Sequence, residues 1–512
     1  MDRKLPRRAL TALLLTGLLA GPAAAGDFID TRLSFVFSEN NFLAGPGETQ
    51  VNSPGFGIGA DKSNTLFFDN YETRFSGFET MSHLVLYSEL PSFFENLKTE
   101  ASLVVRFLIG GESAGDDWYK YNKIYDAGSY IRLTYDLSGG IRDDKNIQLV
   151  LFPISGDRFR AGYSYKISWG GSGIFPLNNG IVPGAKLQLN LPNAYAFAGL
   201  KTTQIRENIG DTEQTEMVTN YGALAGGGVD WKGLRLDVNG GYFTRGTFQP
   251  EGLRGEDITG GGYSVQVGYH QGMEIGTSID FKLYENDPDR EYKFFRPEEY
   301  GEGLSFAVKA EFSHLFHTLE DPDRYATSVV QQAYAADLNF AMKWRYLRVH
   351  VDAMFRSMAF LLFNMPSFTP FQDFPDAAQT EPEYFVAAGI DYHFPDLHLT
   401  PGIKFGIQQP ATYTIENLDA DGAMFGGKRT VVVRSLASRD ILPVNEDARL
   451  IYSVKATAKW DISEALAVVG ELYYTWDDNQ IIYVSDFTGL NVYSQFTDAH
   501  ILGLNLAAQA RF

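Results

Sequence analysis

Basic side chains at alternate positions of apolar segments are the residues of this chain whose type and spacing could do chemistry. In extended backbone, successive side chains point to opposite sides, so these residues would gather on polar faces. The candidates are Arg106, Arg132, Arg160, Lys166, Lys186, Arg235, Lys309, Arg348, Arg356, Lys404 and Lys455. Fewer acids fall on the same faces, namely Asp30, Asp136, Asp237, Asp280, Glu311, Asp352, Asp391 and Glu471. A surplus of fixed positive charge would attract anions, whereas charges paired across neighbouring strands would only fill the interior.

Catalytic and metal-binding patterns are weak in this sequence. The histidines are dispersed and lack the spacing of a metal site: His83, His270, His314, His317, His350, His393, His398 and His500. Two Ser-His pairs, 82–83 and 313–314, are adjacent in the chain, and neighbours in a strand point to opposite faces. Neither pair can therefore act as nucleophile and base. We expect no enzyme activity, no metal and no cofactor.

Charge and cysteine content exclude further classes. The formal net charge is −20, which argues against nucleic-acid binding because that function needs a basic surface. The chain has no cysteine, so a disulfide-stapled secreted fold is excluded. The acidic surplus lies in polar runs such as 287–289, 320–323 and 419–421. These runs are either solvated loops or ligands for divalent cations.

Alternation of apolar and polar residues predicts the strands that carry these side chains. It is clearest over 159–167, 275–283, 304–312, 347–355 and 450–458. One face of each segment is apolar and the other is polar. Lengths near ten residues match a strand that crosses a bilayer at a tilt.

The predicted connections are of two kinds. Short links are expected at 191–193, 231–233, 271–272, 395–396 and 461–463. Long polar segments are expected at 40–73, 205–217, 364–381 and 408–429. Short turns at one end and long loops at the other are typical of an up-and-down membrane barrel. The segments predict about 18 strands, within a range of about 16 to 20.

The two ends of the sequence carry separate signals. Basic residues at positions 3, 4, 7 and 8, an apolar run over 9–20 and Ala23–Ala25 predict a signal peptide over 1–25. The mature domain would then be 26–512, and strand pattern from Ile29 leaves no room for an N-terminal plug. Apolar positions alternate from 500 to the terminal Phe512.

The signal, the repeated strands and the aromatic end resemble those of the porin-like outer-membrane β-barrels of Gram-negative bacteria. The resemblance implies an all-β, antiparallel up-and-down transmembrane barrel in the cell outer membrane, with Phe512 read by the barrel-assembly machinery. It also implies contact with outer-membrane lipid and with lipopolysaccharide, through cations on the acidic loops. The segment 156–171 resembles a family-specific motif.

Two functions agree with this resemblance. The first is a porin-like channel, lined by the basic residues above, that passes small polar solutes, anionic ones included, or an exported polymer. The alternative is a structural or interaction barrel of an envelope machine for motility, adhesion or polysaccharide export, bound to other envelope proteins and without its own open pore.

Overall fold

A computed structural model describes residues 30–39, 42–43, 80–90, 93–109, 124–126, 129–137, 145–157, 159–164, 167–175, 181–208, 214–273, 300–364, 371–417, 427–433, 439–485 and 492–511. The predicted signal peptide, Phe512, Lys166 and the predicted strand 275–283 lie outside these residues. Side chains of β1 and of Arg106 are likewise not described.

Nineteen strands form the main antiparallel sheet. They are β1 (Asp30–Glu39), β2 (Thr80–Leu90), β3 (Leu97–Ile109), β4 (Ile124–Asp126), β5 (Tyr130–Asp136), β6 (Asn146–Phe152), β7 (Gly184–Leu191), β8 (Ala194–Asn208), β9 (Thr215–Trp231), β10 (Leu234–Thr247), β11 (Asp257–Gln271), β12 (Leu304–Glu320), β13 (Ser328–Trp344), β14 (Leu347–Arg356), β16 (Glu383–Tyr392), β17 (Leu399–Gln409), β21 (Ile451–Asp461), β22 (Leu466–Trp476) and β25 (His500–Arg511). Among the described residues, no helix is long and apolar enough to cross a membrane.

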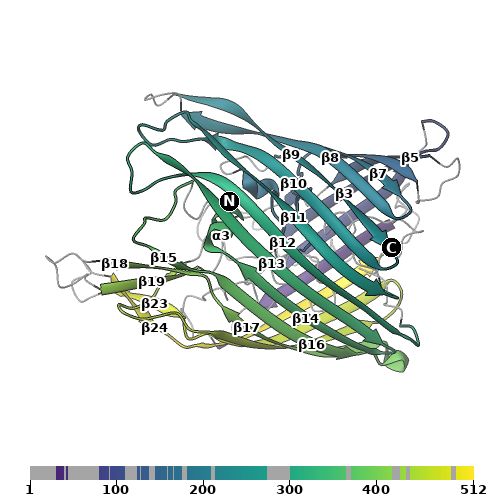
Figure 1. Ribbon diagram of the computed structural model, residues 1–512. Helices are drawn as coiled ribbons and strands as arrows, with labels where there is room; N and C mark the ends of the chain where they lie inside the picture. The colour runs from purple at the N-terminus through teal and green to yellow at the C-terminus, as the bar shows by residue number, and fades with distance from the viewer. Residues whose placement is uncertain are drawn as a thin grey trace, which may run out of the picture.

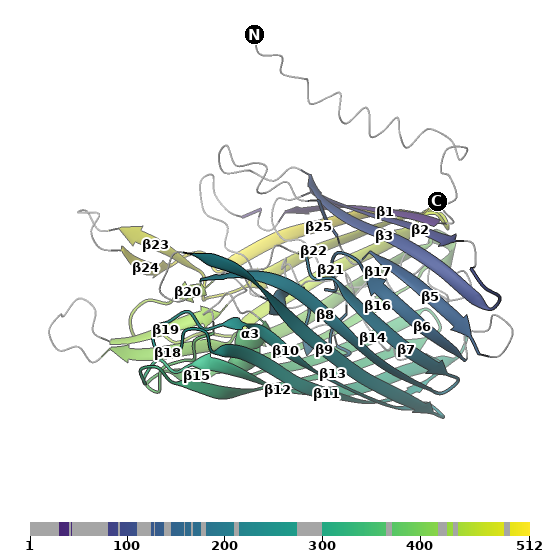
Figure 2. The same ribbon diagram turned by 90° about the horizontal axis from the view of Figure 1, so that it is seen from above.

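The pairings of this sheet form a ring. Each strand pairs with the next one of the sheet, apart from the short β4, which pairs only with β3. β1 pairs with β2 on one side and with β25 on the other, where Arg32 lies opposite Arg511. The succession of pairings thus returns to its first strand, and the strands enclose an interior (Figures 1 and 2). Every backbone group in such a ring can find a partner without water.

The structure has more strands than the sequence predicted. The main sheet falls within the expected range, but the described residues form two further sheets. They contain β15 (Gln379–Glu381), β18 (Thr412–Asn417), β19 (Gly427–Val433) and β20 (Arg439–Ile441), and separately β23 (Ile481–Ser485) and β24 (Val492–Phe496). Of these strands, β15, β18 and the start of β19 lie in segments predicted as long loops. β18, β19, β23 and β24 project beyond the ring in Figure 1. The predicted loop 205–217 is strand at both ends, where β8 and β9 pair through Asn208 and Thr215.

Several predicted strands and links are confirmed, and two are wrong. β12, β14, β21 and β25 cover the predicted segments, and tight links follow β7, β9, β16 and β21. At the β9–β10 link, Lys232 and Gly233 have φ values of 53° and 85°, which a two-residue hairpin turn requires. The link at 271–272 is not a two-residue turn between paired strands, because β11 ends at Gln271 and its partner β12 begins only at Leu304. The segment 159–167 is not a strand of the sheet.

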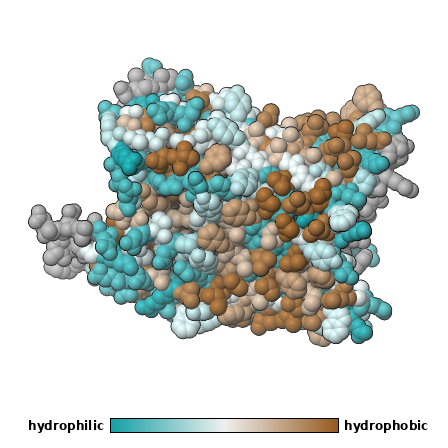
Figure 3. Space-filling view, viewed as in Figure 1, coloured by the Kyte–Doolittle hydropathy of each residue, from teal (hydrophilic) through white to brown (hydrophobic). Residues whose placement is uncertain are grey.

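The outward face of the ring is apolar and ends in aromatic residues. On β13, Tyr334 and Trp344 are 37% and 54% exposed, and on β9, Tyr221 and Trp231 are 60% and 66% exposed. Each pair is separated by about ten residues, or about 34 Å along the strand at ~3.4 Å per residue. A tilt of ~40° reduces this to about 26 Å, close to the ~25 Å band of membrane barrels. Figure 3 shows apolar side chains gathered over this part of the strands.

Candidate functional site: the occluded interior

A segment between β6 and β7 folds into the ring instead of continuing it. We call its described residues within 155–175 the plug. Phe159, Trp169 and Phe175 of the plug are 2%, 0% and 0% exposed, respectively. They belong to a cluster that also includes Phe243 of β10 and inward residues of strands from β3 to β16. The predicted strand 159–167 is therefore a buried lumenal segment, and its alternation reflects packing on two sides.

Polar contacts fasten the plug to three neighbouring strands. The Trp169 indole nitrogen donates to Ser264 Oγ of β11 at 2.9 Å. The Glu311 carboxylate of β12 accepts from the backbone N–H groups of Tyr163 and Ser164, and Asn239 of β10 accepts from Gly162 N–H. Strand side chains thus satisfy backbone groups of the plug that would otherwise be buried without partners. Burial also raises the pKa of the Tyr163 phenol in the plug, so it stays protonated.

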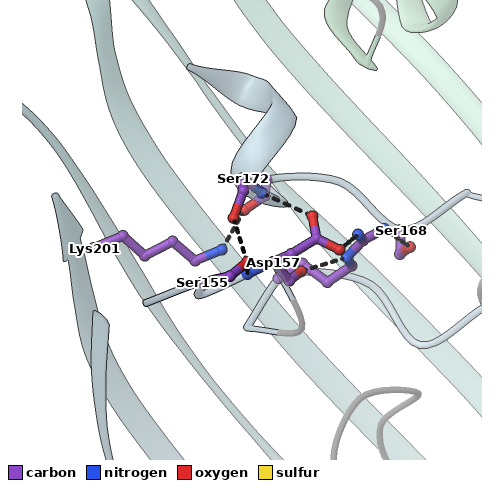
Figure 4. Close-up of polar contacts among 7 residues, drawn as sticks. Ser155, Asp157, Ser168, Ser172 and Lys201 are labelled. Carbon is purple, nitrogen blue, oxygen red and sulfur yellow. Dashed lines mark hydrogen bonds and ion pairs between the residues drawn. The ribbon is translucent and has the colours of Figure 1, made fainter. Parts of the chain in front are cut away.

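Internal polar contacts hold the shape of the plug. Asp157 accepts from the Ser172 backbone N–H at 3.0 Å and from the Arg160 guanidinium at 2.9 Å. Lys201 of β8 donates to the Gly170 carbonyl at 2.7 Å. Figure 4 shows these groups converging beneath the short 3-10 turn η3 (Ser172–Ile174). Gly170 has a φ of 77°, and an added Cβ there would lie 2.8 Å from the Phe243 ring, so this position needs glycine.

A second inward segment completes the filling. The helix α3 (Met358–Asn364) follows β14 and contacts β12, β13 and η3. It lies between the walls of strands in Figure 1. The Phe363 ring meets the Trp169 ring edge-on at 5.8 Å between centroids. Plug and helix therefore share one apolar core inside the ring.

Most predicted pore-lining residues are paired with carboxylates. Arg132 Nε is 2.6 Å from Glu100, Arg235 Nε is 2.7 Å from Asp237, Arg348 Nε is 2.8 Å from Asp391, Arg356 Nε is 2.7 Å from Glu383, Lys404 Nζ is 3.2 Å from Asp352, and Lys455 Nζ is 3.5 Å from Glu471. All of these groups lie on the inward face of the ring. Their pairing follows the alternative in which the charges fill the interior.

The other predicted residues are scattered. Arg160 lies in the plug and contacts Asp157 and Ser168. Lys186 of β7 is buried and donates to Gln188, and Lys309 of β12 is half-buried. Arg106 has a described backbone only, and Lys166 lies outside the described residues, so neither is assigned a contact.

The prediction missed inward acids and inward bases alike; Lys201 and Arg245 are buried cations that it did not include. Glu100 and Glu383 are buried partners of arginines, and Glu207 and Asp337 are also buried. Glu100 lies near the start of β3, and Glu383 follows Pro382 at the edge of a predicted loop. Continuing the alternation of each strand through these boundaries would have identified both.

Water reaches only part of the interior on the strands β10 to β17. Near the short links, the inward side chains of Arg235, His350 and Lys404 keep 11%, 16% and 14% exposure, respectively. Near the opposite end, the side chains of Arg356 and Glu383 are each 5% exposed. Arg348 and Asp391, beside His350, are only 8% and 0% exposed, so the inward face is charged and mostly buried. Among the described residues there is no group of three or more side chains that could hold a metal ion.

Comparisons with known proteins give fold likenesses only. No family model and no curated protein matches the sequence. The structure is similar to OpdL of Pseudomonas aeruginosa (TM-score 0.40, 9% identity, 94% of this chain and 97% of that chain). It is also similar to a BenF-like porin of Pseudomonas fluorescens Pf-5 (TM-score 0.43, 9% identity, 94% of this chain and 97% of that chain). A third similar structure is Wzi of Escherichia coli, a carbohydrate-binding β-barrel involved in group 1 capsule assembly (TM-score 0.39, 9% identity, 100% of this chain and 90% of that chain). We therefore argue the function from the side chains of this chain.

Proposed function

We propose that this chain is a Gram-negative outer-membrane β-barrel channel whose passage is closed by the plug and opens when the plug moves. Small polar solutes or a polymer would cross after the plug leaves its seat. The observation that carries the proposal is the combination of a charged inward face with a separate segment seated across it.

The outward face supports the membrane location. Exposed leucine, valine, isoleucine and phenylalanine residues cover it between two aromatic rims, and a patch of this extent is unstable in water. A charge on such a face costs about 2–4 kcal/mol at the bilayer midplane. The tight links and the C-terminus share one rim of the ring (Figure 1), which would face the periplasm.

The contacts of the plug support gating. It is tied to the wall by individual hydrogen bonds, each worth about 0.5–1.5 kcal/mol net, and by its buried aromatic rings. No covalent link joins it to β8–β12, since the chain has no cysteine. The plug can therefore leave its seat while the ladder of strand pairings stays intact.

The apolar core favours a second candidate, a structural barrel that never opens. Trp169, Phe175, Phe243, Phe360 and Phe363 are all 0% exposed, and such packing resembles a domain core more than a latch. In that case the projecting hairpins β18–β19 and β23–β24 would be the working surfaces, in contact with other envelope proteins.

Conductance in planar bilayers separates the two candidates. Purified wild-type protein should show rare openings of large conductance, because the plug must first leave. Weakening the seat should make the same openings frequent. A wild-type barrel that stays silent under voltage and salt gradients, together with a silent weakened variant, would favour the structural role.

A further inference from the structure

Arg245 of β10 is a buried cation without a carboxylate partner in the described part of the chain. Its side chain is 1% exposed. Nε donates to the Ile174 carbonyl of the plug at 3.1 Å, and Nη2 donates to the Phe363 carbonyl of α3 at 3.2 Å. The Phe363 and Phe371 rings lie 4.9 and 5.0 Å from the guanidinium carbon. Within the described residues, Nη1 has no hydrogen-bond partner.

Three other buried arginines of the ring have carboxylate partners. Arg132, Arg348 and Arg356 each meet a carboxylate oxygen, at 2.6, 2.8 and 2.7 Å, respectively. A buried charge is costly unless an opposite charge compensates it. The sequences 176–180 and 365–370, which follow the plug and α3, contain no Asp or Glu. Among the described residues, no carboxylate gives Arg245 the compensation that Glu100, Asp391 and Glu383 give to the other arginines.

A second polar side chain lies beside the same ring of α3. His317 of β12 is 1% exposed, and its imidazole centroid is 5.4 Å from that of Phe363. Neither of its ring nitrogens has a partner in the described part of the chain. A neutral imidazole offers one N–H donor, and Nη1 of an arginine offers two. The unsatisfied groups are therefore mainly donors around a net positive charge.

We propose that Arg245 and His317 form a buried site for a small inorganic anion of the size of chloride. An anion accepts from N–H donors and supplies the missing negative charge, which a neutral ligand does not do. Because Arg245 and His317 are each 1% exposed, the ligand must be small and stripped of its hydration shell. Arg245 also holds the carbonyls of Ile174 and Phe363, so an anion here would stabilise the plug and α3 against the wall. The proposal does not depend on transport.

Anion-dependent stability of the full chain in detergent tests the site. The temperature at which the folded form is lost should be measured at constant ionic strength, with chloride replaced stepwise by gluconate. A ligand that binds only the folded state raises this temperature with its concentration, so the wild-type temperature should increase with chloride. Crystals grown in bromide should give an anomalous peak within hydrogen-bond distance of Arg245 Nη1.

Variants distinguish this site from general salt effects. Arg245→Gln should abolish the chloride response, and His317→Leu, which keeps the arginine, should weaken it. Arg356→Gln is the matched control, since it removes a buried arginine that has its own carboxylate, and it should keep the full response. A wild-type temperature that is the same in chloride and gluconate, or an equal response in Arg245→Gln, would overturn the proposal. A bromide peak only at other positions would do the same.

Discussion

Truncation of Trp169 to alanine is the sharpest test of the plug as a gate. The Trp169 side chain is fully buried, packs against Phe243 and Phe363 with centroid distances of 6.2 and 5.8 Å, and donates to Ser264. Replacing a buried aromatic residue by alanine costs about 3–5 kcal/mol, and every ~1.4 kcal/mol is a tenfold change in an equilibrium. If the whole cost falls on the seated plug, Trp169→Ala raises the unseated population by about two to nearly four powers of ten.

Single-channel recording measures this population as open probability. Ser264→Ala removes the bond to Trp169 and a second bond to Ser313 Oγ on the neighbouring strand. Only the Trp169 bond holds the plug, so a loss of about 0.5–1.5 kcal/mol should increase opening by about 2- to 13-fold. Trp460→Ala is the control, because Trp460 is 50% exposed on the outward face and should leave opening unchanged. An open probability within twofold of wild type for Trp169→Ala, with a barrel that still migrates as folded before heating, would refute the gating role of the plug.

Further predictions concern the plug anchor, the faces of β14 and assembly. Glu311→Gln leaves one acceptor oxygen for two plug N–H groups. Because an unsatisfied buried N–H costs about 1–3 kcal/mol, the opening frequency in bilayers should increase at least fivefold. Val351→Arg on the outward face should lower the free energy of unfolding in urea by about 2–4 kcal/mol; His350→Arg, on the inward face, should change it by less than about 1 kcal/mol, and a reversed order would contradict the facing. Deletion of Phe512, which lies outside the described residues, should reduce the folded protein in outer-membrane fractions; unchanged levels would argue against a terminal assembly signal.

The period of the outward face made the fold predictable from the sequence. On β12, β14 and β21, one face of the strand meets an apolar environment and the other meets the polar interior. This difference imposes the strict alternation that the sequence shows. In the plug, the alternation of the sequence does not correspond to one apolar and one polar face. Phe159, Ala161 and Ile167 alternate in the same way but are packed from both sides, so periodicity alone could not separate them from a strand. Gly162 and Gly170, which adopt positive φ, are the local signal against a regular strand.

The candidate site was harder to predict because it depends on register. Charges such as Lys404 and Asp352 pair although β16 separates their strands. No pattern along one strand reveals such a contact. Likewise, the contact of Glu311 with the plug spans a sequence separation of 148 residues. The sequence of each strand predicts which side chains point inward. The partner of each inward charge, in contrast, depends on how all the strands of the ring pair.

The residues that the plug now covers should set the selectivity of an open channel. The arginines and lysines of β5, β10, β14, β17 and β21 are already neutralised by neighbouring carboxylates, so they give little net preference for anions. Departure of the plug would uncover Glu311, and Asp337 lies directly opposite it on β13. It would also uncover Lys201 and Arg245, which now donate to plug carbonyls, but these two cations lie singly on β8 and β10. Two adjacent carboxylates in a narrow passage attract cations.

Reversal potentials of Trp169→Ala under a salt gradient should therefore show mild cation preference. The preference should weaken between 0.1 M and 1 M salt, as the Debye length falls from about 10 Å to about 3 Å. Replacing Asp337 by Asn in the same background should move the potential toward zero, whereas Asp461→Asn, which changes a buried carboxylate near the short links, should leave it nearly unchanged. Anion preference in Trp169→Ala would mean that the paired basic residues remain electrostatically exposed and that the plug does not cover the filter.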